Sequence, residues 1–119
     1  MKIAFTSQGY SMEAPIDKRF GRAKNFVIYD EDTEEVGVKD NSQNLGAAQG
    51  AGVQASQNVA DLGVGAIVTG NVGPKAFSGL NAAGIDIYIG AEGTVKQAYE
   101  AFKAGKLQKA AGANVGGHW

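Results

Sequence analysis

The sequence predicts an α/β domain built on a five-stranded mixed sheet, and three observations lead to that prediction. The first is a hairpin, in which the apolar run Asn25–Tyr29 precedes an alternating strand at Val36 and Val38. The second is a series after residue 46 in which helical patterns alternate with strands, which favours parallel strands joined by right-handed crossovers. The third is the run Gly65–Thr69, which is apolar without alternation, as expected of a strand covered on both faces.

The first half of the chain contains one long loop and one helix besides this hairpin. A short apolar strand, Lys2–Thr6, leads into the connection Ser7–Lys24, whose length is typical of functional or disordered loops. A helix is predicted over Ala47–Leu62, where small side chains recur on one face and can approach a sheet closely. Gly63 suits the C-terminal cap of this helix.

The second half predicts a helix, a strand and the order of the sheet. A helix begins at Pro74, whose fixed φ suits the first helical position, and ends at Gly84. The strand Ile85–Ile89 alternates apolar and polar residues, which is typical of an edge. With strands numbered along the chain, the order 3-2-1-4-5 with strand 2 antiparallel satisfies all these patterns.

A capping box predicts the last helix. Thr94 and Gln97 have the required spacing, and Gly105 ends the apolar periodicity that follows. Residues 110–119 show no periodicity and are predicted to be a flexible C-terminal tail. The expectation is therefore a single domain over residues 1–109 followed by that tail.

Composition excludes several classes of function. The 119-residue chain has a net charge of -1, which argues against general nucleic-acid binding, and no run of 18 apolar residues that could span a membrane. The N-terminus enters a strand at once, without a signal peptide, so a cytoplasmic protein is expected. Cysteine is absent, which excludes disulfides and thiolate ligands, and the one histidine is His118.

Four loops are predicted to meet at one end of the sheet. In the predicted order, strands 1 and 4 are neighbours whose connections leave in opposite directions, and ligands of open α/β sheets bind beyond such a switch point. The loops are Ser7–Lys24, Asp40–Gly46, Gly70–Pro74 and Gly90–Thr94. The Gly-rich turn before Pro74 precedes a helix N-terminus, where backbone N–H groups can hold an anion.

The first of these loops ends in a basic segment. Lys18, Arg19, Arg22 and Lys24 stand against one carboxylate, Asp17, in a chain of slightly negative net charge. Together with helix N–H groups, these cations could form a site for a polyanion. A solvated basic turn is an equally good interpretation. The glycine turns could likewise serve only to reverse the chain, since a short Gly-x-x-Gly is a weak motif.

Other candidates are weaker, and catalysis finds little support. His118 is more typical of a loose tail, although it could add one metal bond, and Met12 more often fills a gap than binds a soft metal. No histidine is placed to activate Ser7 or Ser42, and no P-loop is present. The central strands also lack the carboxylates that two-metal chemistry needs.

Several segments resemble a known family. Met1–Ala4 opening a strand, Arg19–Ala23 before the next strand, Gly70–Phe77 and Gly93–Val95 fall in register over nearly the whole chain. The chain thereby resembles the nitrogenase iron–molybdenum-cofactor carrier family, which includes accessory proteins that hold cofactor precursors and the small molybdenum–copper orange protein of anaerobic bacteria. The resemblance implies a three-layer α/β/α fold of the ribonuclease H-like type.

The resemblance also implies a site. Phe20, Gly21 and Arg22 match the family segment near the pocket, and Gly70, Asn71 and Gly73 match the turn beneath it. We therefore expect charge from Arg19, Arg22 and Lys18, and shielding from Phe20 and Val72. The backbone N–H groups of Asn71–Gly73 and of Gly93 and Thr94 are expected to line the cradle.

The function implied by the resemblance is non-enzymatic carriage of a preformed anionic cluster. Without cysteine, the cargo would be a molybdenum–copper sulfide cluster or an iron–molybdenum cofactor precursor, held by hydrogen bonds, charge and apolar contact. A cofactor-accepting protein is a possible partner, whereas nucleic acid and membrane are not expected. The alternatives are a protein–protein adaptor with a vestigial pocket and, less favoured, an enzyme acting on a small anionic substrate.

Overall fold

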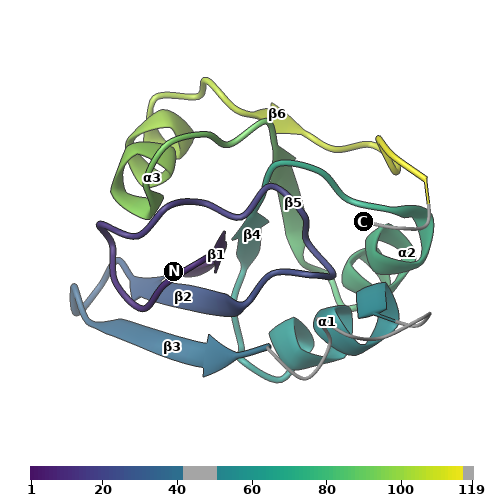
Figure 1. Cartoon of the computed structure of the whole chain (residues 1–119), viewed down its shortest axis with the longest axis horizontal. Helices are drawn as coiled ribbons and strands as arrows, with labels where there is room; N and C mark the ends of the chain where they lie inside the picture. Colours follow the sequence, from purple (N-terminus) through teal and green to yellow (C-terminus); the bar gives the residue numbers. More distant parts are fainter. Residues whose placement is uncertain (42–50, 117–119) are drawn as a thin grey trace.

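The computed structural model describes residues 1–41 and 51–116, and these contain three helices and six strands (Figure 1). In chain order they are β1 (Lys2–Ser7), β2 (Asn25–Asp30), β3 (Val36–Asp40), α1 (Ala51–Ala60), β4 (Ala66–Val68), α2 (Pro74–Ala82), β5 (Asp86–Ile89), α3 (Val95–Lys103) and β6 (Gln108–Lys109). The predicted start of the first helix at Ala47 lies outside the described residues.

All six strands belong to one mixed sheet, in the order β3-β2-β1-β4-β5-β6. β2 is antiparallel to both β1 and β3, whereas β1, β4 and β5 run parallel. In this register Ala4 lies opposite Ile28 of β2 and Ile67 of β4. The predicted order of the first five strands is confirmed, and so is the antiparallel direction of strand 2.

The prediction of five strands with Ile85–Ile89 at an edge is wrong, because β6 covers that edge. Tyr88 pairs with Lys109 and Ile89 with Gln108 in an antiparallel ladder. The Lys109 ammonium also lies 3.3 Å from a carboxylate oxygen of Asp86. A two-residue strand with no apolar side chain has no periodicity, so backbone pairing alone places it.

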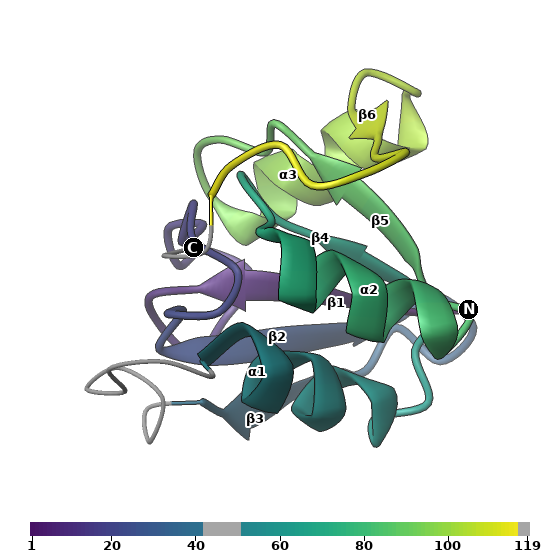
Figure 2. The ribbon, with the colours of Figure 1, turned by 90° about the vertical axis from the view of Figure 1, so that its right-hand side faces the viewer.

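The helices cover both faces of the sheet. α1 and α2 lie on one face and α3 lies on the other (Figures 1 and 2). Each face has its own core, so that Ile67 of β4 points to α1 and α2 while Val68 points to α3. The unalternating pattern of this strand is thus explained by burial on both faces. The three-layer arrangement agrees with the expectation, and the ribonuclease H-like assignment stays a prediction.

Both predicted helix starts within the described residues are confirmed. Pro74 occupies the first turn of α2 after the N-cap Gly73. At α3 the Thr94 hydroxyl accepts from the Gln97 N–H at 3.1 Å, and the Gln97 carboxamide oxygen accepts from the Thr94 N–H at 2.9 Å. Within the described ranges, no helix has both the length and the apolar character needed to cross a bilayer.

Candidate functional site

The site lies at the switch point of the sheet. β1 and β4 are parallel neighbours, with Ile3 opposite Ala66 and Phe5 opposite Val68. From β1 the chain continues to β2 on one side, and from β4 it continues to β5 on the other. The loops that follow these two strands therefore diverge from a common point, which is where ligands of open α/β sheets bind.

Two buried threonines fasten the first loop to this point. Thr6 is the last residue but one of β1, Thr69 directly follows β4, and both are fully buried. The Thr6 hydroxyl lies 2.5 Å from the Asp17 carbonyl oxygen and 2.9 Å from the Thr69 hydroxyl. Because unpaired hydroxyls are costly to bury, this arrangement holds the start of the basic segment in place.

The basic segment runs alongside the glycine turn. The Asn71 backbone N–H donates to the Lys18 carbonyl oxygen at 2.8 Å, and the Asn71 carboxamide donates to the same oxygen at 3.0 Å. The Phe20 N–H in turn donates to the Asn71 carbonyl oxygen at 3.3 Å. This contact brings together two segments that are 53 residues apart in the chain, as the sequence predicts.

A hollow of about 230 Å³ opens where these segments meet β5. It is lined by residues of three loops, namely Lys18, Gly70, Asn71, Gly90, Ala91 and Glu92. The first three belong to the predicted site. The last three lie outside the predicted site, because the sequence predicts ligand contacts in the turn Gly90–Thr94 only at Gly93 and Thr94.

The cations of the basic segment do not form one cluster. Arg19 is about half exposed, with its Nε 3.7 Å from Asp17 Oδ1, and that carboxylate oxygen also accepts from the Arg19 N–H at 3.0 Å. Lys18 is exposed at the hollow and Arg22 is half-buried. The Lys24 ammonium lies 5.4 Å from the centre of the Tyr10 ring.

Several backbone N–H groups expected in the cradle are already hydrogen-bonded within the protein. The Asn71 N–H donates to Lys18, and the Val72 N–H donates to the Asn114 carboxamide oxygen at 2.7 Å. The Thr94 N–H is taken by the capping box. These three groups are therefore not free donors, which corrects the expectation. The backbone N–H groups of the turn therefore donate mainly to other residues of the same chain.

The C-terminal segment reaches the same turn. Asn114 makes three hydrogen bonds there: its N–H donates to the Val72 carbonyl oxygen at 3.1 Å, its Oδ1 accepts from the Val72 N–H, and its Nδ2 donates to Asn71 Oδ1 at 3.0 Å. Sequence reasoning missed this residue, because a lone asparagine among small residues has no pattern that signals a contact.

Comparison with known proteins identifies the family. The sequence profile described as dinitrogenase iron–molybdenum cofactor matches residues 1–105. The chain belongs to the dinitrogenase iron–molybdenum cofactor family. An uncharacterized protein of Methanocaldococcus jannaschii is 32% identical over 102 residues, which span 80% of this chain and 86% of that protein.

Solved structures of related proteins share the fold of this chain. The apo form of the orange protein from Desulfovibrio gigas is 43% identical, with a TM-score of 0.92 over 96% of both chains. A Thermotoga protein provisionally assigned as a NifB protein is 35% identical, with a TM-score of 0.80 over 91% of both chains.

Among the described residues, no three acidic, histidine or cysteine side chains gather in a way that could hold a metal ion.

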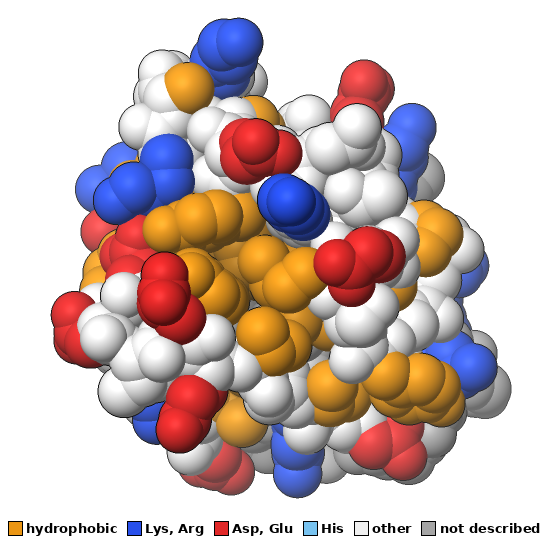
Figure 3. Space-filling view, turned by 90° about the vertical axis from the view of Figure 1, so that its left-hand side faces the viewer, with side chains coloured by type: hydrophobic (Ala, Val, Ile, Leu, Met, Phe, Trp, Pro, Cys, Tyr) orange, Lys and Arg blue, Asp and Glu red, His pale blue; other side chains and the backbone are white. Residues whose placement is uncertain are grey.

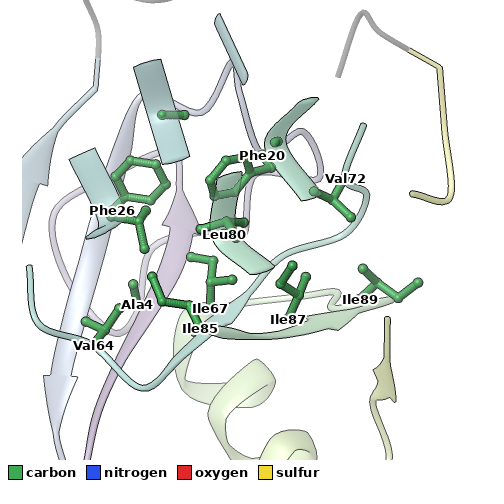
Figure 4. Close-up of a cluster of buried hydrophobic side chains, with 13 residues drawn as sticks. Ala4, Phe20, Phe26, Val64, Ile67, Val72, Leu80, Ile85, Ile87 and Ile89 are labelled. Atoms are coloured by element: carbon green, nitrogen blue, oxygen red, sulfur yellow. The ribbon is translucent and has the colours of Figure 1, made fainter. Parts of the chain in front are cut away.

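Three residues that the family resemblance placed at the pocket are buried instead. Phe20 and Val72 are fully buried in the core between the sheet and the helices α1 and α2, and the Phe20 ring centre lies 5.7 Å from that of Phe26 (Figure 4). Gly21 is also buried, and its carbonyl oxygen accepts from Asn41 at 3.4 Å. These buried residues anchor the basic segment and the glycine turn on the side that faces the core. His118 lies outside the described residues.

This protein has a second hollow, on the face of the sheet that α3 covers. A cleft of about 360 Å³ lies among Met12, Glu13, Tyr29, Lys96, Tyr99 and Glu100. Figure 3 shows hydrophobic side chains gathered in a depression with charged side chains around it. Its Tyr99 hydroxyl donates to Glu31 at 2.8 Å. Burial and this hydrogen bond raise the pKa of Tyr99 to about 12, and the bond lowers the pKa of Glu31.

Proposed function

We propose that this protein carries a preformed anionic metal–sulfur cluster, held without covalent bonds to the chain and without catalysis by it. The cargo is a molybdenum–copper sulfide cluster or an iron–molybdenum cofactor precursor. It would rest at the hollow between the basic segment, Lys18–Arg22, and the turn Gly70–Gly73.

The observation that carries the proposal is the hydrogen-bonded junction of these two segments at the switch point. It places a polar hollow at the position where folds of this type bind ligands, in a family described by a metal cofactor. The similarity to an orange protein that was solved in its apo form supports the same proposal.

The charges of the basic segment and the hollow favour an anion by a small margin, because two carboxylates, Asp17 and Glu92, oppose Lys18, Arg19 and Arg22. Lys18 and Glu92 both line the hollow and offset each other. Asp17 offsets part of the charge of Arg19, and the remaining positive charge comes from Arg19 and Arg22, whose planar guanidinium groups suit large, weakly hydrated anions. The chain contains no cysteine and so offers no thiolate ligand, which favours a cargo held through charge, hydrogen bonds and apolar contact.

Reconstitution tests this proposal. The apo protein would be incubated anaerobically with tetrathiomolybdate and a copper salt, passed through gel filtration, and analysed for metals and visible absorption. Molybdenum and copper should elute with the protein in a fixed ratio to it. Protein fractions without stoichiometric metal would show that the isolated chain is not a carrier of this cluster.

Substitution of Arg22 tests the contribution of charge. Arg22→Ala should weaken retention of the cluster several-fold, since one exposed or half-exposed charge contact is worth on the order of 1 kcal/mol. Lys2→Ala is the matched control, because it removes a cation at the opposite end of β1. Equal retention by wild type and Arg22→Ala would remove Arg22 from the site, provided that both have the same circular dichroism spectrum.

A second candidate, a protein–protein adaptor, is favoured by the exposed outer strand β3, which ends the order of the sheet among the described residues. Every residue of β3 is exposed, including Val36 and Val38 with 45% and 43% of their surface accessible. Exposed strand edges are common sites of strand addition by a partner. Capture of a partner by metal-free protein, undiminished in Arg22→Ala and lost in Val38→Asp, would favour the adaptor over the carrier.

A further inference from the structure

The C-terminal segment is joined to the candidate site through a chain of three residues. Asn114 Nδ2 donates to Asn71 Oδ1 at 3.0 Å, and Asn71 Nδ2 donates to the Lys18 carbonyl oxygen at 3.0 Å. Asn71 and Lys18 both line the hollow. A residue 43 positions downstream thus supplies one of the two hydrogen bonds that orient the carboxamide in the wall of the hollow.

The bond from Asn114 selects one orientation of that carboxamide. A carboxamide presents an acceptor on one side and two donor hydrogens on the other. Because Asn114 donates to Oδ1, the Asn71 Nδ2 is directed to Lys18, where one of its hydrogens is used. The reversed orientation would set the Asn71 oxygen against the Lys18 carbonyl oxygen, which is unfavourable.

Asn114 is itself held firmly enough to perform this role. Its own backbone and Oδ1 both bond to Val72, and the segment begins at Ala110, whose N–H donates to the Ile87 carbonyl oxygen at 2.8 Å. The segment also lies beyond the match to the family, which ends at residue 105. The contact is therefore a feature of this chain that the family profile does not include.

We infer that Asn114 is a positioning residue of the cargo site, and that the C-terminal segment helps to hold the Asn71 carboxamide in the orientation that leaves its second Nδ2 hydrogen for an anion. The inference rests on the proposed function for the identity of the cargo. Loss of Asn114 leaves the Asn71 carboxamide held by its single bond to the Lys18 carbonyl oxygen, so it is less ordered and the anion must pay part of the entropic cost of ordering it.

The first experiment needs no cargo. The side-chain amide signals of Asn71 would be followed by ¹⁵N NMR in the apo protein, for wild type, Asn114→Ala and the control Asn81→Ala, which removes an exposed asparagine on α2. The Asn71 signals should shift in Asn114→Ala only, because the carboxamide loses the hydrogen bond that its Oδ1 accepts while its Nδ2 keeps the bond to Lys18. Unchanged Asn71 signals would overturn the inference.

The second experiment uses tetrathiomolybdate with copper as the probe and measures the dissociation rate. Asn114→Ala should release the cluster several-fold faster than wild type. Asn114→Asp keeps the acceptor for Val72, but it cannot donate to Asn71 and adds a negative charge. Release should therefore be faster still. If Asn114 acts through Asn71, Asn114→Ala should add little to the release rate of an Asn71→Ala variant. If Asn114 served only to hold Val72, the effects of the two substitutions would add, and that result would overturn the inference.

The two experiments separate this inference from the proposed function. Absence of cluster binding by wild type and all variants would overturn the proposed function, and with it a role of Asn114 toward this cargo. Normal binding with identical dissociation rates in wild type and Asn114→Ala would overturn the inference and leave the proposed function standing.

Discussion

Gly70 shows at the scale of one residue why the site has its shape. A Cβ built at this position would lie 2.8 Å from the Cα, the Cβ and the carbonyl oxygen of Lys18. Real side chains do not approach backbone atoms so closely, so only glycine lets the two segments meet. The glycine that the sequence suggested as a turn residue therefore serves mainly for close approach.

Substitution of this glycine tests the explanation. Gly70→Ala should destabilise the protein by about 1–3 kcal/mol, because backbone rather than a flexible side chain must move to admit the methyl group. Gly37→Ala is the matched control, since a Cβ there meets nothing within 4 Å. Urea unfolding would measure both changes. A Gly70→Ala protein as stable as Gly37→Ala would show that the approach of Lys18 does not require glycine.

The contact between the helices α1 and α2 also depends on glycine for close approach. A Cβ at Gly52 would lie 3.3 Å from the Cβ of Ala76, and one at Gly79 would lie 2.5 Å from the Ser56 hydroxyl oxygen. The small residues that predicted close packing against a sheet also bring the two helices together. This close contact fixes the position of α2 against α1, and with it the position of the turn that precedes α2.

Gly79→Ala tests this close contact. Alanine gains about 1 kcal/mol of helix propensity over glycine, but its methyl group overlaps the Ser56 hydroxyl at a cost of about 1–3 kcal/mol. We expect a net loss of about 1 kcal/mol in thermal or urea unfolding. The double variant Gly79→Ala with Ser56→Ala removes the overlapping oxygen and should recover at least half of the loss. A single variant more stable than wild type would contradict the close contact.

Elements with a periodic pattern or a capping signal could be predicted from the sequence. The unalternating run at β4, the capping box at Thr94 and the order of five strands were all predictable, because burial and local hydrogen bonding leave a pattern. β6 and the Asn114 contact could not be predicted, since each depends on long-range hydrogen bonding by residues with no periodicity. At the site, charge and glycine signals indicated Lys18, Gly70 and Asn71. Spatial proximity alone adds Glu92 and its neighbours.

At the scale of the whole molecule, one polar cluster ties α3 to the hairpin side of the sheet. Glu31 accepts from the Tyr99 hydroxyl at 2.8 Å, and the Lys103 ammonium lies 3.0 Å from the same carboxylate. The Tyr99 ring also packs edge-on against Tyr29, with ring centres 4.9 Å apart. The cluster joins two parts of the chain 68 residues apart, so its ionisation affects the stability of the fold as a unit.

The pKa shifts within this cluster predict how stability depends on pH. The pKa of Glu31 is lowered from 4.5, so the folded state binds fewer protons than the unfolded state in acid, and stability falls as pH drops below about 4.5. The pKa of Tyr99 is raised from 10.0 to about 12, so the unfolded state loses its proton first, and stability falls as pH rises above about 10.

Tyr99→Phe separates this cluster from the other ionisable groups. The variant keeps the ring against Tyr29 but removes the hydroxyl, so it should be less stable at pH 7 by about 1.5–3 kcal/mol, the usual contribution of a hydrogen bond to a charged group. Its free energy of unfolding should also fall less steeply between pH 10 and pH 12 than that of wild type, because the phenol no longer titrates. Urea unfolding followed by circular dichroism across this pH range measures both effects. Parallel curves for the two proteins above pH 10 would mean that Tyr99 does not link pH to folding.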